Sequence, residues 1–251
     1  MNLDFLTTGA AAADGAVGHS PMEGQTRAAG AELEVRDGWS IAAHYDGVGA
    51  DAEAATARRT AGWADVSHLG KLELQGPPDQ LDRVAGECAA ELRLGEAVRA
   101  GEAWWCRLTT TRALIVCEAR VTDGLRAQLT EASAGADRVT LTDVTSNFAA
   151  MTIVGPLARE VFARFCALDL RPAVTPVRAL RPGSIGRQPG ILVCEAEDRY
   201  LFLFGWATGE YMWSVVADAG EHLGGRPIGI DALSELPGAG GDGFPEEALS
   251  A

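Results

Sequence analysis

The stretch Leu72-Glu73-Leu74-Gln75-Gly76-Pro77 ends a strand-like run and passes into a helix-like run, and the chain repeats this arrangement. The first strand is entered from Asp65-Val66-Ser67. In the same way, Asp143-Val144-Thr145 leads into Met151-Thr152-Ile153-Val154-Gly155-Pro156 and then a second helix-like run. A strand that ends at Gly-Pro and is followed by a helix is one structural unit, so the sequence predicts that this unit occurs twice.

A second pair of matching segments lies between these two points. Ala113-Leu114-Ile115-Val116-Cys117-Glu118-Ala119 corresponds to Gly190-Ile191-Leu192-Val193-Cys194-Glu195-Ala196. Both pairs are offset by 77 to 79 residues, which indicates a single duplication. A repeat of this length is a module of several secondary-structure elements.

The first repeat reads as the element order βαββαβ, and the second follows the same order with a strand and a strand pair in its middle. We expect the first to contain strands 71–75, 103–109, 113–119 and 138–142 and helices 78–92 and 122–134; the second, strands 150–154, 184–187, 191–196, 200–204 and 227–230 and helices 157–168 and 208–223. Two such units predict an α+β fold of two ferredoxin-like repeats related by a pseudo-twofold axis. A ligand would then bind in the groove between the two sheets.

The repeats also suggest how the chain is divided. We expect a flexible arm over residues 1–18, a first half over 19–142, a second half over 143–235 and a disordered tail over 236–251. The first half opens with an N-terminal extension that contains strands 31–35 and 39–45 and a helix over 50–60.

Composition excludes several classes of function. A net charge of -14 disfavours nucleic-acid phosphate as a partner. No apolar window approaches the roughly 20 residues of a membrane span, and no basic region precedes Ala10 to Ala13 as in a signal peptide. The five cysteines lack metal-ligand spacing, so we expect free thiols, no metal site and a cytoplasmic protein.

The segment from Asp65 to Gly76 is similar to the D-V-S-H-M-G segment of the aminomethyltransferase (glycine-cleavage T-protein) family. The later stretch from Cys166 to Pro172 and the helix around Trp213 resemble the gamma subunit of heterotetrameric sarcosine oxidase. The resemblance covers roughly residues 19–235 and implies a tetrahydrofolate-binding fold. The family's C-terminal barrel domain has no counterpart in this sequence.

The chain departs from that family at its functional positions. Where active members carry a pair of aspartates, one of them catalytic, this sequence has Arg112 and Ala113. The glutamate that holds the folate ring in the family corresponds to Leu201, and the segment 230–235 lacks the family's arginines. A cation cannot replace a carboxylate that steers a proton, so no catalytic residue is assigned.

The resemblance and the groove together indicate which residues would contact a folate or another small carboxylate ligand. Arg112 could bind a carboxylate through two parallel hydrogen bonds. The alternative for His68 is a turn-capping role, and Glu195 with its counterpart Glu118 reads either as a solvated charge or as half of a carboxylate pair. The predicted ligand-binding residues are Ser67, His68, Leu69, Arg112, Glu195 and Glu197.

Two functions remain open. One is an aminomethyltransferase-like, folate-binding protein of tetrahydrofolate-dependent one-carbon metabolism of glycine or sarcosine, with a degenerate catalytic site. The other is a non-catalytic, gamma-like subunit of a heteromeric oxidase or one-carbon enzyme complex. The missing carboxylates favour the second function, whereas the D-V-S-H segment beside the groove favours the first.

Overall fold

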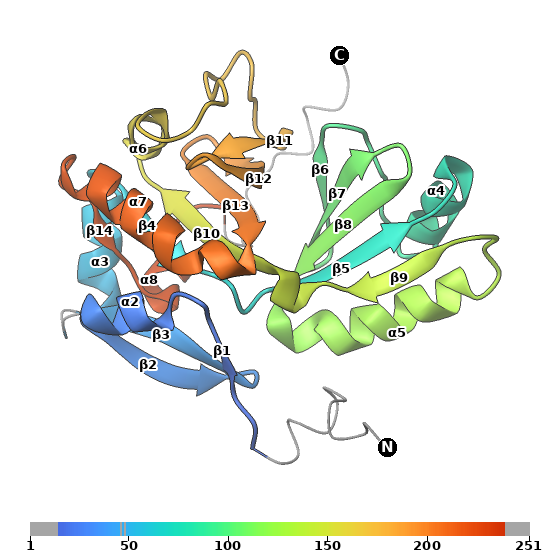
Figure 1. The fold of residues 1–251 in the computed structure, drawn as a ribbon, viewed down its shortest axis with the longest axis horizontal. Helices are drawn as coiled ribbons and strands as arrows, with labels where there is room; N and C mark the ends of the chain where they lie inside the picture. The colour runs from blue at the N-terminus through green and yellow to red at the C-terminus, as the bar shows by residue number, and fades with distance from the viewer. Residues whose placement is uncertain (1–14, 46, 48, 239–251) are drawn as a thin grey trace.

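The computed structural model describes residues 15–45, 47 and 49–238, and the expectation of an α+β fold is confirmed (Figure 1). The strands of this part of the chain form a five-stranded, a six-stranded and a three-stranded sheet. The predicted arm at 1–18 and tail at 236–251 lie largely outside the described residues. No helix in the described ranges is long and apolar enough to cross a membrane.

The five-stranded sheet is antiparallel throughout, in the order β6-β7-β8-β5-β9. One face is covered by α4 and α5, whose apolar side chains pack on Leu72, Leu74 and Trp105. The elements are β5 (Gly70–Gln75), α4 (Pro78–Glu87), β6 (Ala97–Ala100), β7 (Ala103–Thr109), β8 (Arg112–Cys117), the 3-10 turn η2 (Ala119–Val121), α5 (Thr122–Ser133) and β9 (Thr140–Asp143).

The six-stranded sheet has the order β11-β12-β13-β10-β4-β14. Helices α6 and α7 cover its outer face, where Phe162 packs edge-on against Tyr200 and Phe202. The elements are β4 (Gly62–Asp65), η3 (Thr145–Asn147), β10 (Phe148–Val154), α6 (Ala158–Ala163), β11 (Leu180–Ile185), β12 (Gln188–Ala196), β13 (Arg199–Gly205), η4 (Trp206–Thr208), α7 (Gly209–Glu221) and β14 (Arg226–Pro227).

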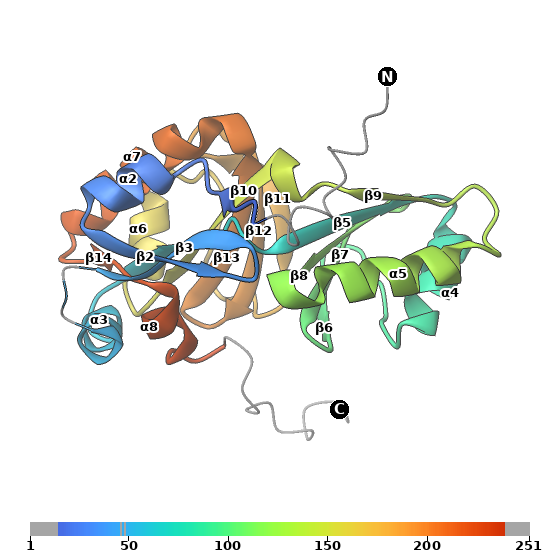
Figure 2. The same cartoon turned by 90° about the horizontal axis from the view of Figure 1, so that it is seen from below.

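The N-terminal extension lies beside the six-stranded half, and Figure 2 shows it from below. The Glu53 carboxylate, which is buried, joins it to the C-terminal end of the described chain. Glu53 accepts hydrogen bonds from the backbone N–H groups of Tyr45 and Gly229, each at 2.6 Å. The elements are β1 (Gly18–His19), α2 (Glu23–Ala28), β2 (Ala31–Arg36), β3 (Trp39–Tyr45), α3 (Ala50–Ala57) and, after Gly229, α8 (Ile230–Ser234).

The two larger sheets face each other across a shared apolar layer. Leu114 and Val116 of β8 belong to the same buried cluster as Val193, Leu201 and Leu203 of the other sheet. Helices α4, α5, α6 and α7 therefore lie on the outer faces, and the space between the sheets is filled by side chains from both sheets and from α8.

The chain passes from the six-stranded to the five-stranded sheet at Asp65-Val66-Ser67. The Asp65 carboxylate accepts a hydrogen bond from the Ser67 N–H at 2.9 Å, which fixes the turn. Val66 N–H donates to the Ala150 carbonyl at 2.9 Å, and Ala150 N–H donates to the Ser67 hydroxyl at 3.2 Å. The turn after β4 is thus bonded to β10 while the chain leaves for β5.

At the second crossing, Asp143-Val144-Thr145, the chain returns from the five-stranded to the six-stranded sheet, and the equivalent hydrogen bonds form. Thr145 N–H donates to the Asp143 carboxylate at 2.9 Å. Val144 N–H donates to the Lys71 carbonyl at 2.8 Å, and Lys71 N–H donates to the Thr145 hydroxyl at 3.0 Å. Consequently β4 pairs with β10 and β9 pairs with β5, and the predicted boundary between residues 142 and 143 falls inside β9.

Some predicted elements differ from the structure. The strand predicted over 184–187 is β11, which lies earlier, at 180–185, because Gly186 and Arg187 adopt positive φ and form the turn between β11 and β12. The helix predicted over 157–168 ends at Ala163. Trp104 and Trp105 point to opposite faces, but both are buried, since each face of β7 is covered.

We predict that Ser67→Ala destabilises the protein by about 1 to 3 kcal/mol, because the buried N–H of Ala150 loses its acceptor. Thermal or denaturant unfolding would measure this change. Ser214→Ala on the exposed face of α7 is the matched control and should change stability by less than about 0.5 kcal/mol. Equal stabilities of the two variants would contradict the prediction.

Candidate functional site

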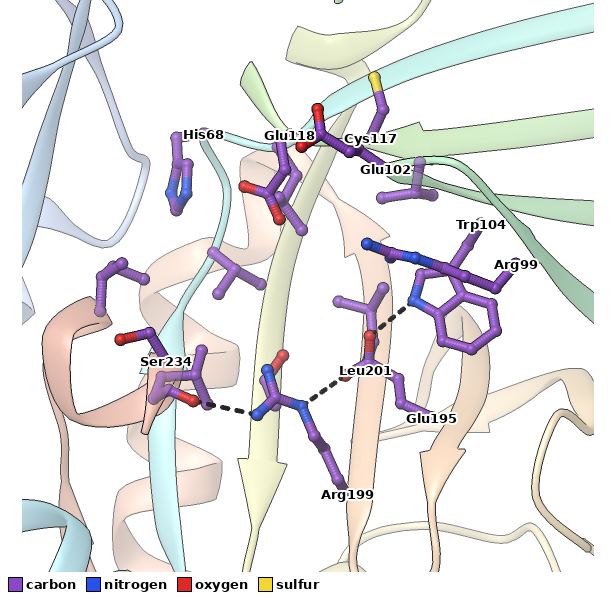
Figure 3. Close-up of a pocket in the computed structure, with 16 residues that line it drawn as sticks. His68, Arg99, Glu102, Trp104, Cys117, Glu118, Glu195, Arg199, Leu201 and Ser234 are labelled. Carbon is purple, nitrogen blue, oxygen red and sulfur yellow. Dashed lines mark hydrogen bonds and ion pairs between the residues drawn. The ribbon is translucent and has the colours of Figure 1, made fainter. Parts of the chain in front are cut away.

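A cavity of about 140 Å³ lies between the two larger sheets (Figure 3). Both sheets and α8 contribute to its wall, which combines apolar side chains with charged ones. The lining residues are Val66, His68, Leu69, Arg99, Glu102, Trp104, Val116, Cys117, Glu118, Thr152, Glu195, Arg199, Leu201, Ile230, Leu233 and Ser234.

One wall of the cavity is fixed by a buried ion pair. Glu195 accepts a hydrogen bond from Arg199 Nε at 3.0 Å and another from the indole Nε1 of Trp104 at 2.8 Å. Arg199 Nη1 donates to the carbonyl of Leu233 in α8 at 3.1 Å. The pair thus joins β12, β13, β7 and α8, and removing either charge would leave its partner uncompensated at a cost of about 3 to 5 kcal/mol.

Arg99 of β6 supplies a second cation at the edge of the cavity. Its guanidinium lies over the Trp104 ring, 5.4 Å from the ring centroid, which is within the range of a cation–π contact. Figure 3 shows the guanidinium directed toward the cavity from the side of the five-stranded sheet.

Glu118 follows β8 and is half-buried, with its carboxylate directed into the cavity (Figure 3). Burial raises the pKa of Glu118, while Arg99 and Arg120 lower it and Glu102 raises it further. Glu102 itself is paired with Arg120, 2.8 Å between Oε2 and Nη1. Glu118 accepts no hydrogen bond at its side chain from any residue within the described ranges.

His68 also lines the cavity (Figure 3). Burial, together with the positive charge of Lys71, lowers the pKa of His68 to about 4. The imidazole is therefore neutral at physiological pH and can act there as a hydrogen-bond donor and acceptor without carrying charge.

Lys71, the chain's only lysine, is completely buried behind this histidine. Its Nζ donates a hydrogen bond to the Ser67 carbonyl at 2.6 Å. Burial lowers the pKa of Lys71 to about 7, and the nearby groups Asp65, Cys117 and Asp143 oppose that shift. The amine thus changes charge near neutral pH while it supports the turn that carries His68.

Of the predicted ligand-binding residues, the structure places His68, Leu69 and Glu195 in the cavity wall. Ser67 does not reach the cavity, because its side chain is wholly buried against β10. Glu197 is exposed in the turn between β12 and β13.

Arg112 also lies away from the cavity. It is five residues before Cys117 on β8, which corresponds to about 17 Å along the strand. Its guanidinium is paired with Glu73 of the adjacent strand, so a ligand carboxylate at Arg112 would have to displace Glu73. The expectation that Arg112 lies beside the ligand groove is therefore corrected.

Sequence reasoning missed several residues of the cavity. Arg199 could have been found, since a charge at the start of a run of apolar strand residues, four positions after Glu195, suggests a buried ion pair. Arg99 and Ser234 carry no comparable signal, because β6 and α8 are too short to show a periodic pattern. Within the described part of the chain, no group of His, Cys, Asp and Glu side chains is arranged to hold a metal ion.

Comparison with known proteins identifies the family. Residues 22–237 match the family described as the GCVT N-terminal domain. The chain belongs to this family. An aminomethyltransferase of Frankia alni is 28% identical over 233 residues, covering 86% of this chain and 62% of that relative. An aminomethyltransferase of Parafrankia sp. is 28% identical over 241 residues, covering 88% and 63%. The chain thus spans less than two thirds of these GCVT-domain relatives.

Two solved structures share the GCVT-type fold. The aminomethyltransferase T of the glycine cleavage system from Bartonella henselae gives a TM-score of 0.73 at 18% identity, covering 88% of this chain and 62% of that one. A chain of the heterotetrameric sarcosine oxidase from Corynebacterium sp. U-96 gives a TM-score of 0.61 at 20% identity, covering 69% and 92%. The resemblance to both families found in the sequence is confirmed at the level of fold.

We predict that the GCVT-type fold of this chain gains stability as pH rises from about 7 to 10.5, because the folded state has lost the Lys71 proton in this range while the unfolded state keeps it. Below this range Lys71 is protonated in both states, so the folded state is destabilised by the full free-energy cost of burying its charge. Each unit of pKa depression corresponds to about 1.4 kcal/mol.

Denaturant unfolding of wild type and Lys71→Met at pH 7 and pH 10 measures this contribution. Lys71→Met also removes the bond to the Ser67 carbonyl, but that loss is the same at both pH values. The wild type should gain more stability than the variant between the two. Parallel pH profiles would contradict the prediction.

Proposed function

We propose that this chain binds tetrahydrofolate in cytoplasmic one-carbon metabolism of the glycine or sarcosine type, and that it does not carry out the family's standard aminomethyl transfer. The observation that carries the proposal is the cavity where His68 and Leu69 of the D-V-S-H segment meet Leu201 of β13. The resemblance places the first segment near the ligand and Leu201 at the ring-binding position, so two positions that would contact a folate line the same cavity.

The departure of the site from the family pattern supports the second part of the proposal. Leu201, which stands where the resemblance places the ring-binding glutamate, contributes an apolar side chain to the cavity. Arg112, which stands at the aspartate pair, is engaged by Glu73. Neither position supplies the carboxylate that the family's transfer chemistry requires.

The size of the cavity limits how a folate could bind. A volume of about 140 Å³ holds about five water molecules, far fewer atoms than a whole folate. We infer that most of the folate lies at the cavity rim, beside α8 and Ser234, along the groove between the sheets.

We further propose that the two facing sheets are ferredoxin-like βαββαβ repeats related by a pseudo-twofold axis. The orders β9-β5-β8-β7 and β14-β4-β10-β13-β12 support this, with β4 inserted into the second repeat. The matching hydrogen bonds of the two Asp-Val-Ser/Thr turns give independent support.

A second function is favoured by one comparison. The structural alignment with the sarcosine oxidase chain covers 92% of that chain. On this alternative, the protein is a non-catalytic, gamma-like subunit of a heteromeric oxidase, and the fold serves assembly rather than ligand binding.

We predict saturable binding of tetrahydrofolate and 5-formyltetrahydrofolate in calorimetric titrations of the purified protein. Ser234→Trp places an indole at the cavity rim and should weaken binding at least tenfold, which is about 1.4 kcal/mol. Ser214→Trp on exposed α7 is the matched control and should bind like wild type. Absence of any binding heat would overturn the folate proposal.

The subunit alternative has its own measurement. Sarcosine-oxidising activity in an extract of the native cells should co-elute with this chain on size exclusion and be removed when an antibody depletes the chain. Activity that remains in full after depletion would exclude the alternative.

A further inference from the structure

The inner part of the cavity presents opposite charges from opposite sheets. Arg199 of β13 and Glu118 after β8 both line it, and Figure 3 shows their charged groups on facing sides of the same space. In the described residues these two groups form no ion pair with each other. The space between them is therefore bounded by a cation at one end and an anion at the other.

The Arg199 side chain is 6% exposed, and two of its three nitrogen atoms are bonded to protein. Nε donates to Glu195 and Nη1 donates to the Leu233 carbonyl. Nη2 has no hydrogen-bond partner in the parts of the chain described. It is not fully enclosed by protein atoms, so a ligand can reach it. A buried guanidinium nitrogen thus faces the cavity with its donors free for an anionic group.

Glu118 supplies the complementary end. Its half-buried carboxylate, which faces the same space, has the free acceptors that an ammonium group requires. Thr152 of β10 adds a buried hydroxyl to the wall without a hydrogen-bond partner among the residues described. Hydrogen bonds with one ionised partner are about twice as strong as neutral ones, so both ends would contribute to affinity.

The charged side chains of the cavity wall, together with Arg120, sum to no net charge, which disfavours a ligand that carries only one charge. The cations of Arg99 and Arg199 balance the anions of Glu118 and Glu195, and Glu102 is balanced by Arg120. A ligand that is neutral overall but carries separated opposite charges fits this arrangement better than a net anion or cation. Room for about five water molecules restricts the ligand to fewer than about ten non-hydrogen atoms.

We propose that the inner cavity binds a small zwitterionic amino acid, with its ammonium group against Glu118 and its carboxylate against Arg199 Nη2 and the Thr152 hydroxyl. This inference deepens the proposed function, because it assigns the amine-bearing ligand that would lie beside a folate at the rim. It does not require the folate to be bound.

The test titrates the full chain with glycine, N-methylglycine, alanine and proline. Acetate and methylamine serve as matched probes that each carry only one of the two charges. At least one amino acid should bind saturably, and both single-charge probes should bind at least tenfold more weakly. Acetate or methylamine binding as tightly as every amino acid would overturn the proposal, as would no amino-acid binding at all.

Glu118→Gln removes the charge of the carboxylate while keeping its shape, and it should weaken amino-acid binding at least tenfold. Glu221→Gln on the exposed end of α7 is the control and should have no effect. Unchanged affinity in Glu118→Gln would overturn the assignment of the ammonium site. Folate titrations of the same proteins separate the two proposals, since folate binding without amino-acid binding rejects this inference alone.

Discussion

The fold depends on the two places where the chain crosses between the sheets. At each crossing an aspartate accepts the N–H of the residue two positions later, and the hydroxyl of that residue accepts an N–H from a core strand of the sheet being left. Backbone groups that would otherwise be buried without partners are satisfied in this way. Because β4 pairs with β10 and β9 pairs with β5, each crossing joins a strand of one sheet directly to a strand of the other.

Near these crossings, polar and charged side chains are buried between the sheets, where a purely hydrophobic layer would be expected. The space between the sheets is mostly apolar, but it also holds the Lys71 amine and the Glu195–Arg199 pair. Burying these groups is costly unless they are hydrogen-bonded, and each is bonded to backbone or indole donors and acceptors. The cavity is the part of this layer where the polar groups are not fully paired.

The α+β class could be predicted because apolar runs and Gly-Pro signals are local features of the sequence. The pairing of β4 with β10 in the six-stranded sheet could not, since strand pairing between distant segments leaves no periodic signal. Arg112 was misplaced for a related reason: a strand was predicted over 113–119, directly after it, but which end of that strand meets the other sheet depends on the packing. His68 and Glu195 were found because they lie at strand ends, where side chains from both sheets converge.

The burial of Lys71 also determines the chemistry of the molecular surface. The other 20 basic residues of the chain are arginines, so every side-chain cation that the protein presents to solvent is a guanidinium. Such groups keep their charge at any physiological pH and do not react with acylating reagents as amines do. Acylation of a lysine side chain in this protein would therefore report that the space between the two sheets has opened.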